Sequence, residues 1–212
     1  VKMLLRQVHS CEHRSHLPAQ LAVYTAVFRM VFKAKSDYAQ DMTLVIGIED
    51  KKSVILASDS FIGDDDHRDV IDTPKWFRLG SIWFGYAGTI AIAQVAEHNY
   101  KVAQPSPGES HSAYLFRVVQ GIYAACRDAG LKPDDGSLLI AYKSKVYYVT
   151  EGGAPVRSGH GYAAIGSGEM QALSALAVTK DSPDNVKRAW DVMDAVSRHC
   201  SQVSAPFHVI RV

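Results

Sequence analysis

Three residues of the chain, Thr43, Asp59 and Lys75, are equally spaced and have the side chains that an N-terminal threonine nucleophile needs. A threonine hydroxyl is a weak nucleophile until a base takes its proton, and the α-amine of a chain that begins with threonine can be that base. An α-amine titrates near pH ~8, close to what a base at neutral pH requires. A lysine ammonium nearby favours the neutral amine, and an aspartate neutralises the lysine. The set therefore predicts hydrolysis in which Thr43, as first residue, is both nucleophile and base.

The elements around these residues are expected to bring them to one end of a sheet. The apolar runs at 43–49 and 53–59 indicate two buried strands that form a hairpin. If this hairpin is symmetric about Lys51, Thr43 lies directly across from Asp59, with Cβ atoms roughly 5 Å apart. Lys75 comes just before the strand predicted to begin at residue 76, and it is expected at the same end of the sheet.

The rest of the chain alternates groups of strands with pairs of helices. Strands are predicted at 76–88 (a pair with a turn near Gly80), 137–142, 145–150, 162–166 and 207–212, and helices at 89–103, 112–129, 168–180 and 183–200. Segregated helices with hairpin-connected strands indicate an α+β fold. Strands that are apolar on both faces need cover on both faces, which two packed sheets with helices outside each would provide.

The two longest predicted helices each show one apolar stripe at helical spacing. The stripe consists of Leu115, Val118, Val119, Ile122 and Cys126 in the first of them, and of Val186, Ala189, Trp190, Met193, Val196 and Cys200 in the second. The second helix opens with Ser182, Pro183 and Asp184, which suit an N-cap and a first turn.

The composition argues against several classes of protein. The chain has 212 residues, of which 47% are hydrophobic, and a net charge of +1, so no strong attraction to nucleic acid or to membranes is implied. The three cysteines are scattered and odd in number, which indicates no disulfide framework and fits a cytoplasmic location. No apolar run is long enough to span a bilayer. The apolar segment 17–32 is interrupted by Arg29 and is not interpreted as a signal peptide.

Two polar segments contain residue types that can bind metals. Residues 63–69 (GDDDHRD) are interpreted as a solvated loop, and residues 9–16 (HSCEHRSH) lack a recognised zinc spacing. We assign no metal site to either segment.

Several short motifs of the chain occur together in one known family. The ordered pattern MT(L)V…VILASDS…K..RL…GYAGT…AIGSG belongs to a match that covers about residues 42–210. In this pattern the chain resembles the proteasome β-type N-terminal-nucleophile hydrolases, and most closely the HslV-type peptidase subunits of bacterial ATP-dependent proteases. The resemblance implies a four-layer αββα sandwich, which agrees with the predicted order of elements. The catalytic residues that it implies are Thr43 (nucleophile), Asp59, Lys75, Gly88 (oxyanion stabilisation) and Ser167 (in the Gly-Ser-Gly turn).

The resemblance also implies an assembly and a substrate. A threonine endopeptidase of this family forms closed rings of six or seven subunits, stacked in pairs, and degrades unfolded polypeptides with the help of an AAA+ ATPase unfoldase. This chain has no Walker-type loop, so ATP hydrolysis would come from the partner. Tyr86, close before the oxyanion glycine, is a candidate wall of the substrate pocket.

A structural Na⁺ is a further implication of the resemblance, although the chemistry itself needs no cofactor. The segment SRHCSQVSAPFHV resembles the place where HslV-type subunits bind a monovalent cation through main-chain carbonyls. The carbonyls of Ser197, Cys200 and Val203 are therefore candidate ligands. Ser197 and Val203 replace residues that are usually Gly and Thr in the family, but carbonyl ligands do not depend on the type of side chain.

Two other interpretations stay open. The protein is alternatively a catalytically silent or latent ring that acts as a scaffold, because residues 1–42 block the Thr43 amine if they are retained. The intact Thr/Asp/Lys set argues against a silent ring, since a scaffold has no physical need for an ammonium at Lys75. The third interpretation is a stand-alone peptidase or amidohydrolase of the same fold that works without an unfoldase.

Residues 1–42 are predicted to be an N-terminal extension that precedes the hydrolase domain at 43–212. The extension matches nothing in the family and contains six basic and three acidic residues. A Met before a small residue is what methionine aminopeptidase removes. We therefore expect that Met42 is the initiator, or that the extension is removed, so that Thr43 is the first residue of the active enzyme. If the extension is retained, we expect a helix around 18–34 and a latent enzyme.

Overall fold

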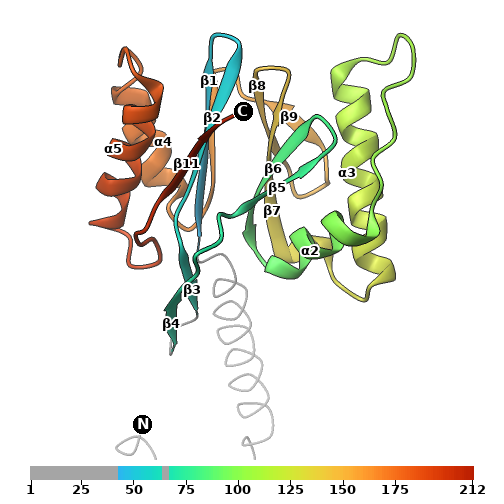
Figure 1. The fold of residues 1–212 in the computed structure, drawn as a ribbon, viewed down its shortest axis with the longest axis horizontal. Coiled ribbons are helices and arrows are strands. Elements are labelled where there is room, and N and C mark those ends of the chain that lie inside the picture. Colours follow the sequence, from blue (N-terminus) through green and yellow to red (C-terminus); the bar gives the residue numbers. More distant parts are fainter. Residues whose placement is uncertain (1–42, 64–66) are drawn as a thin grey trace, which may run out of the picture. The chain divides into compact units, whose positions relative to one another are not determined.

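Most of the described strands form two antiparallel sheets that face each other (Figure 1). The computed structural model describes residues 43–63 and 67–212. In the first sheet the order is β10-β1-β2-β11, with bounds Tyr162–Gly166, Leu44–Asp50, Ser53–Ser58 and His208–Arg211. In the second sheet the order is β5-β6-β7-β8-β9, with bounds Trp76–Leu79, Ile82–Gly88, Gly136–Tyr142, Lys145–Val149 and Pro155–Arg157. The three predicted hairpins, β1–β2, β5–β6 and β7–β8, are confirmed.

Two helices cover the outer face of each sheet. Helices α4 (Glu169–Val178) and α5 (Asn185–Ser197) pack on the first sheet. Helices α2 (Ile90–Asn99) and α3 (His111–Asp128) pack on the second, and a short 3₁₀ turn at Pro133–Asp135 leads into β7. The layers therefore follow the order helix, sheet, sheet, helix, and the predicted four-layer αββα sandwich is confirmed (Figure 1).

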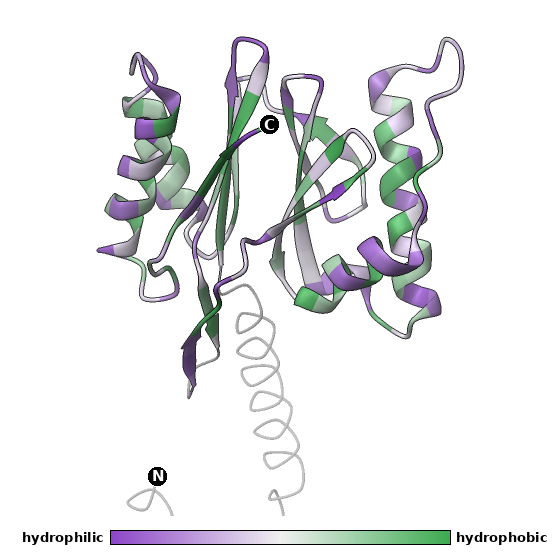
Figure 2. Cartoon of the chain, viewed as in Figure 1, coloured by the Kyte–Doolittle hydropathy of each residue, from purple (hydrophilic) through white to green (hydrophobic). Residues whose placement is uncertain are grey.

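Hydrophobic side chains fill all three spaces between these layers. Along β1, Leu44, Ile46 and Ile48 face helices α4 and α5, whereas Val45 faces the second sheet. Successive side chains of a strand point to opposite faces, so a strand covered on both sides is apolar at consecutive positions. Figure 2 shows hydrophobic residues along the strands of the first sheet and hydrophilic residues at the turns and along parts of the helices.

Two glycines allow the sheets to approach closely near the centre. A Cβ added to Gly85 of β6 would lie 2.6 Å from Cγ1 of Val45, and one added to Gly47 of β1 would lie 3.0 Å from Cδ2 of Leu139. A carbon atom does not fit at the first of these distances unless the Val45 side chain or the backbone shifts. The separation of the sheets is therefore set here by a glycine that faces a branched side chain.

The apolar stripe predicted for α3 is confirmed, because all of its residues are buried. The stripe predicted for α5 is partly wrong, and its last member, Cys200, lies beyond the end of the helix at Ser197. Trp190 is 44% exposed and packs edge-on against Phe207, whereas Arg188 is only 5% exposed. The Arg188 guanidinium donates to the Leu176 carbonyl and to Oγ1 of Thr179 at the end of α4. A charged residue is buried at this position because it satisfies acceptor groups that a helix end leaves unpaired.

Several helix ends also differ from the prediction, and two of them have a clear physical reason. Helix α2 ends at Asn99, earlier than predicted, because Tyr100 is extended and packs on α3, where a Cβ on Gly121 would lie 2.3 Å from its ring. Helix α5 is capped by Asp184, whose carboxylate accepts two backbone N–H groups of the first turn, and not by Ser182. The end of α2 is thus determined by a tertiary contact, and the start of α5 is determined by which of two neighbouring polar residues forms the N-cap.

A small two-stranded sheet occupies a region where only a loop was predicted. Strand β3 (Phe61–Gly63) pairs with β4 (Arg68–Val70). The interpretation of residues 63–69 as a solvated loop is therefore incomplete, although β4 is exposed as expected and residues 64–66 lie outside the described part. Strands of three residues, which include β9, are too short to show an alternating pattern.

Within the described residues, no helix is both long and apolar enough to cross a membrane. The polar segment 9–16 and the helix expected around 18–34 lie outside the described residues.

Candidate active site

The register of the first hairpin places Asp59 level with Leu44 and not with Thr43. The Leu44 N–H donates to Oδ1 of Asp59 at 3.0 Å, and the Asp59 N–H donates to the Leu44 carbonyl at 3.1 Å. The predicted symmetry about Lys51 is wrong, because the hairpin turns through Lys51 and Lys52 together. Lys51 has a φ of 48°, as turns of two residues often require. Thr43 therefore lies one residue beyond the level of Asp59, on the side away from the turn.

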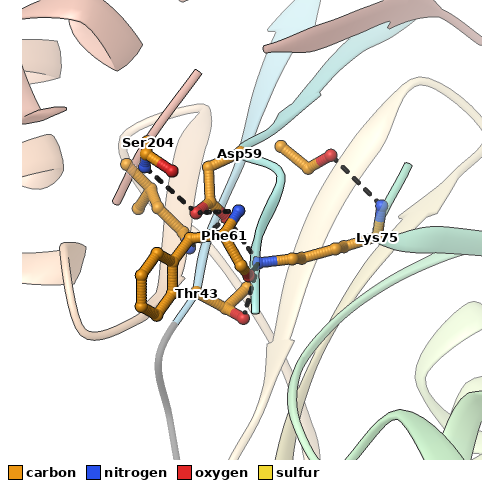
Figure 3. Close-up of polar contacts among 7 residues, drawn as sticks. Thr43, Asp59, Phe61, Lys75 and Ser204 are labelled. Carbon is orange, nitrogen blue, oxygen red and sulfur yellow. Dashed lines mark hydrogen bonds and ion pairs between the residues drawn. The ribbon is translucent and has the colours of Figure 1, made fainter. Parts of the chain in front are cut away.

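The Lys75 ammonium joins the three predicted residues into one cluster (Figure 3). Its Nζ lies 2.9 Å from Oγ1 of Thr43, 2.8 Å from Oδ1 of Asp59 and 2.5 Å from the Phe61 carbonyl oxygen. An ammonium has three N–H donors, and three acceptors are present. The donors are therefore fully used, and the ammonium has a fixed orientation toward the threonine hydroxyl.

The cluster is almost completely buried, with 5% exposure for Thr43, 0% for Asp59 and 3% for Lys75. Burial raises the pKa of the Asp59 carboxyl and lowers the pKa of the Lys75 ammonium, and the attraction between the two charges opposes both shifts. Besides Leu44, the backbone N–H groups of Phe61 (3.1 Å) and Ser204 (3.4 Å) donate to Oδ2 of Asp59. The carboxylate therefore receives backbone donors on both oxygens, which compensates part of its desolvation.

The backbone of Lys75 is anchored to both sheets. Its carbonyl accepts a hydrogen bond from the Tyr86 N–H of β6 at 3.1 Å. Its N–H donates to Oγ of Ser58, the last residue of β2, at 3.2 Å. The lysine thus starts from the edge of the second sheet and extends its side chain into the end of the first.

A small cavity of about 60 Å³ opens beside the cluster. Its lining consists of Thr43, Phe61, Ile62, Gly63, Ile71, Lys75, Tyr86, Gly88 and Ile90. Burial, together with the negative charge of Glu97, raises the pKa of Tyr86 to about 12, so its hydroxyl stays neutral. The walls are otherwise mainly apolar, and Tyr86 lines the cavity where a substrate wall was predicted.

Gly88 lines the same cavity as the threonine hydroxyl and the lysine ammonium. It ends β6 with a φ of +87°, and Thr89 follows as the N-cap of α2. A glycine suits this left-handed conformation because it has no Cβ. A backbone N–H before a helix N-terminus is also a suitable donor for a developing oxyanion.

Ser167 directly follows β10, the strand that pairs with β1. Gly166 is opposite Leu44, so the same register carried one residue further brings Ser167 to the level of Thr43. Gly166 has a φ of +96°, and a Cβ on it would lie 2.1 Å from the Thr43 carbonyl oxygen. The Gly-Ser-Gly turn therefore lies against the backbone of the threonine.

The candidate cation ligands follow the end of helix α5. Ser197 is its last residue, and Cys200 and Val203 are buried against the first sheet. The Val203 N–H donates to the Cys200 carbonyl at 3.1 Å, which leaves that oxygen a second lone pair for a cation. Their role as ligands stays a prediction. No group of His, Cys, Asp and Glu that could bind a metal occurs in the described part of the chain.

Several contributors to the cluster could not be found from the sequence. The Phe61 carbonyl and the Ser204 N–H are backbone groups, which leave no side-chain signal. A weak signal was Ser58, a hydroxyl that directly follows the apolar run Val54–Ala57. Its contact with Lys75 depends on how the two sheets are packed.

No family model matches the chain, and no curated protein matches it in sequence. Solved structures do match. BPH from Thiobacillus denitrificans, in complex with epoxomicin, is 17% identical with a TM-score of 0.67, over 80% of this chain and 97% of that one. HslV from Trypanosoma brucei is 17% identical with a TM-score of 0.61, over 79% of this chain and 98% of that one. Anbu, an ancestral β-subunit from Yersinia bercovieri, is 18% identical with a TM-score of 0.59, over 79% of this chain and 80% of that one. The described part of the chain therefore has the proteasome-like fold of the N-terminal-nucleophile hydrolases.

Proposed function

We propose that the protein is a threonine peptidase whose nucleophile is Thr43. The observation that carries the proposal is the buried Lys75 ammonium, which donates to both the Thr43 hydroxyl oxygen and the Asp59 carboxylate. Burying an ion pair costs desolvation energy, so this arrangement is a poor way to stabilise a fold. It is a good way to orient a nucleophile and to control the protonation of a neighbouring amine.

The reaction proceeds through an acyl-enzyme. Oγ1 of Thr43 attacks the carbonyl carbon of the scissile bond while its proton passes to the neutral Thr43 α-amine. The Gly88 N–H donates to the oxyanion of the tetrahedral intermediate. The amine then gives the proton to the leaving amine of the substrate, and an ester with Thr43 remains. A water molecule that is deprotonated by the same amine hydrolyses the ester, and Thr43 is regenerated.

The substrate is an extended polypeptide that binds beside the strand ends. The cavity next to Thr43 is small, and Ile62, Ile71 and Ile90 make its walls apolar. We infer a preference for a short, uncharged side chain on the residue before the scissile bond. A longer side chain would have to displace a wall.

The active form is proposed to be a homo-oligomeric ring of six or seven subunits, stacked in pairs, that works with an AAA+ unfoldase. The family resemblance is the main support. Helix α4 also exposes Met170 (72%) and Val178 (83%), and exposed apolar residues on one helix favour a protein partner. A monomeric mass in light scattering at micromolar concentration would contradict the ring.

The alternative is a latent or silent protein, and one chemical fact favours it. In the 212-residue chain the Thr43 nitrogen is an amide bonded to Met42, and an amide nitrogen cannot act as the base. The proposed enzyme therefore requires that this bond be absent from the active form.

The deciding experiment compares two forms of the protein, one that contains residues 1–212 and one whose translation starts at Met42. Intact mass shows which chains begin at Thr43, and a set of fluorogenic peptides measures cleavage. We expect activity only where the mass shows Thr43 as the first residue. We also expect epoxomicin to bind to those chains but not to Thr43→Ala. Equal activity of a chain that keeps Val1 would disprove the amine as base.

A further inference from the structure

We propose that Ser58 is a positioning residue for Lys75 and acts through the backbone of the lysine. This inference rests on the proposed function, because it concerns the same reaction. Oγ of Ser58 accepts the Lys75 N–H at 3.2 Å, and Ser58 itself is fully buried. The bond joins the end of β2 in the first sheet to the residue before β5 in the second.

The lysine N–H depends on this acceptor because of its place in the second sheet. Strand β5 is an edge strand with β6 as its only neighbour among the described strands. The Lys75 carbonyl bonds to the Tyr86 N–H of β6, but the Lys75 N–H is directed across to the first sheet. A buried N–H needs an acceptor, and the Ser58 hydroxyl provides it.

Ser58 and Asp59 together fix both ends of one flexible side chain. Asp59 bonds to the Nζ of Lys75, and its neighbour Ser58 bonds to the backbone N–H of the same residue. A lysine side chain has a flexible stem of four carbons. If only the ammonium is held, this stem can adopt several conformations between the backbone and the ammonium. With the backbone also fixed, the ammonium has one direction of approach to the Thr43 hydroxyl.

A contact between two rings next to Ser58 should keep the two sheets together when the Ser58 hydroxyl is removed. His208 of β11 is opposite Ser58, and its ring packs edge-on against Trp76, the first residue of β5, with centroids 6.3 Å apart. Replacement of Ser58 by alanine therefore should loosen the position of Lys75 without separating the strands.

The test compares Ser58→Ala with Ser53→Ala in the peptidase-active form of the protein. Ser53 is the matched control, because it lies on the same strand and its hydroxyl donates to the Asp50 carbonyl, away from the cluster. Rates are divided by the folded fraction from thermal unfolding and by the fraction of chains that begin with Thr43. We expect kcat of Ser58→Ala to fall roughly 10- to 100-fold with KM within about twofold of the parent. Ser53→Ala should keep both constants.

The outcomes separate this inference from the proposed function. If Thr43→Ala cleaves peptides as fast as the parent, the proposed function is wrong, and the inference is wrong with it. If Thr43→Ala is inactive while Ser58→Ala keeps the parental kcat per folded chain, only the positioning role is overturned. Should Ser58→Ala not fold, Ser58→Cys retains the shape with a weaker acceptor. A parental kcat for Ser58→Cys would then overturn the role, and a reduced kcat would support it.

Discussion

Lys75 and Thr43 belong to opposite sheets of the sandwich, yet the Nζ of the lysine lies 2.9 Å from the Oγ1 of the threonine. Thr43 precedes β1, Lys75 precedes β5, and Asp59 follows β2, so each residue lies just outside the end of a strand. Strand ends have defined positions but fewer neighbours than strand centres. This arrangement gives the cluster both fixed geometry and access to the cavity beside it.

Substitution of the threonine tests the nucleophile. Thr43→Ala should lower kcat by more than about 1,000-fold, because the hydroxyl is lost, while thermal unfolding changes little. Thr43→Ser should keep about a tenth of the activity, since serine retains the hydroxyl and the amine but loses the methyl group that restricts χ1. Cleavage of a fluorogenic peptide measures both. Full activity in Thr43→Ala would show that another group attacks.

Substitution of the lysine separates a catalytic ammonium from a salt-bridge partner. Lys75→Ala should be as inactive as Thr43→Ala. Lys75→Arg should not restore activity, because a planar guanidinium is larger and cannot give three bonds from one point. Steady-state rates of peptide cleavage by the parent and the two variants, measured at one pH, test this prediction. Near-normal rates in Lys75→Arg would mean that the residue only neutralises Asp59.

The pH dependence of kcat/KM should follow the Thr43 amine. The amine acts as a base only when neutral, so activity should rise as the pH rises through its pKa. The adjacent Lys75 ammonium disfavours a second positive charge, which lowers that pKa below the ordinary ~8. Tyr86 has a pKa of about 12 and should not titrate in this range. Tyr86→Phe should therefore leave the midpoint unchanged, and a shifted midpoint would assign the titration partly to Tyr86.

Glu49 should make stability depend on pH in acid. Burial acts to raise the pKa of Glu49, but hydrogen bonds from Lys145, the Val146 N–H and Arg157 outweigh it, so the pKa lies below its ordinary value. A carboxyl with a lowered pKa contributes stability above the unfolded pKa of about 4.5, and this is lost as the pH falls through the folded value. Denaturant unfolding should show Glu49→Gln less stable than the parent at pH 7, with the gap closing in acid. A gap independent of pH would contradict this prediction.

Arg188 should be a major contributor to the packing of α4 against α5. Arg188→Ala removes the donor to the Leu176 carbonyl and leaves a buried acceptor unpaired, which costs about 1–3 kcal/mol. The matched control is Lys187→Ala on the same helix, since Lys187 forms an exposed ion pair with Asp191 and should change stability by less than about 0.5 kcal/mol. Unfolding in urea measures both. If both substitutions lowered the free energy of unfolding by the same small amount, the buried hydrogen bonds of Arg188 would not contribute to stability.

Much of the fold could be predicted from the sequence because its strands and helices have strong periodicity. The continuous apolar pattern of β1 correctly indicated cover on both faces, and the stripe of α3 is buried as predicted. The errors lie where one residue decides the outcome. A turn of two residues instead of three shifted Asp59 from Thr43 to Leu44, and Trp190 was assigned to a buried stripe that Arg188 partly occupies.

The site could be predicted only as a set of residue types. Equal spacing and the family pattern selected Thr43, Asp59 and Lys75, and the structure brings their side chains into hydrogen-bond contact. The contacts that orient them could not be predicted, because they come from backbone groups of Phe61 and Ser204. These groups are placed by a short strand and by the segment after α5, neither of which has a periodic signal.

The contact between Gly85 and Val45 has a consequence for how this protein can change over evolution. A Cβ on Gly85 would lie 2.6 Å from Cγ1 of Val45, so a larger residue there must displace the Val45 side chain or move the two sheets apart. Because Lys75 and Thr43 come from opposite sheets, sheets that moved apart would also lengthen the path between ammonium and hydroxyl. A substitution far from the reacting atoms would thus lower turnover before it unfolded the chain. Selection on the rate of peptide cleavage would then preserve a glycine that makes no contact with substrate.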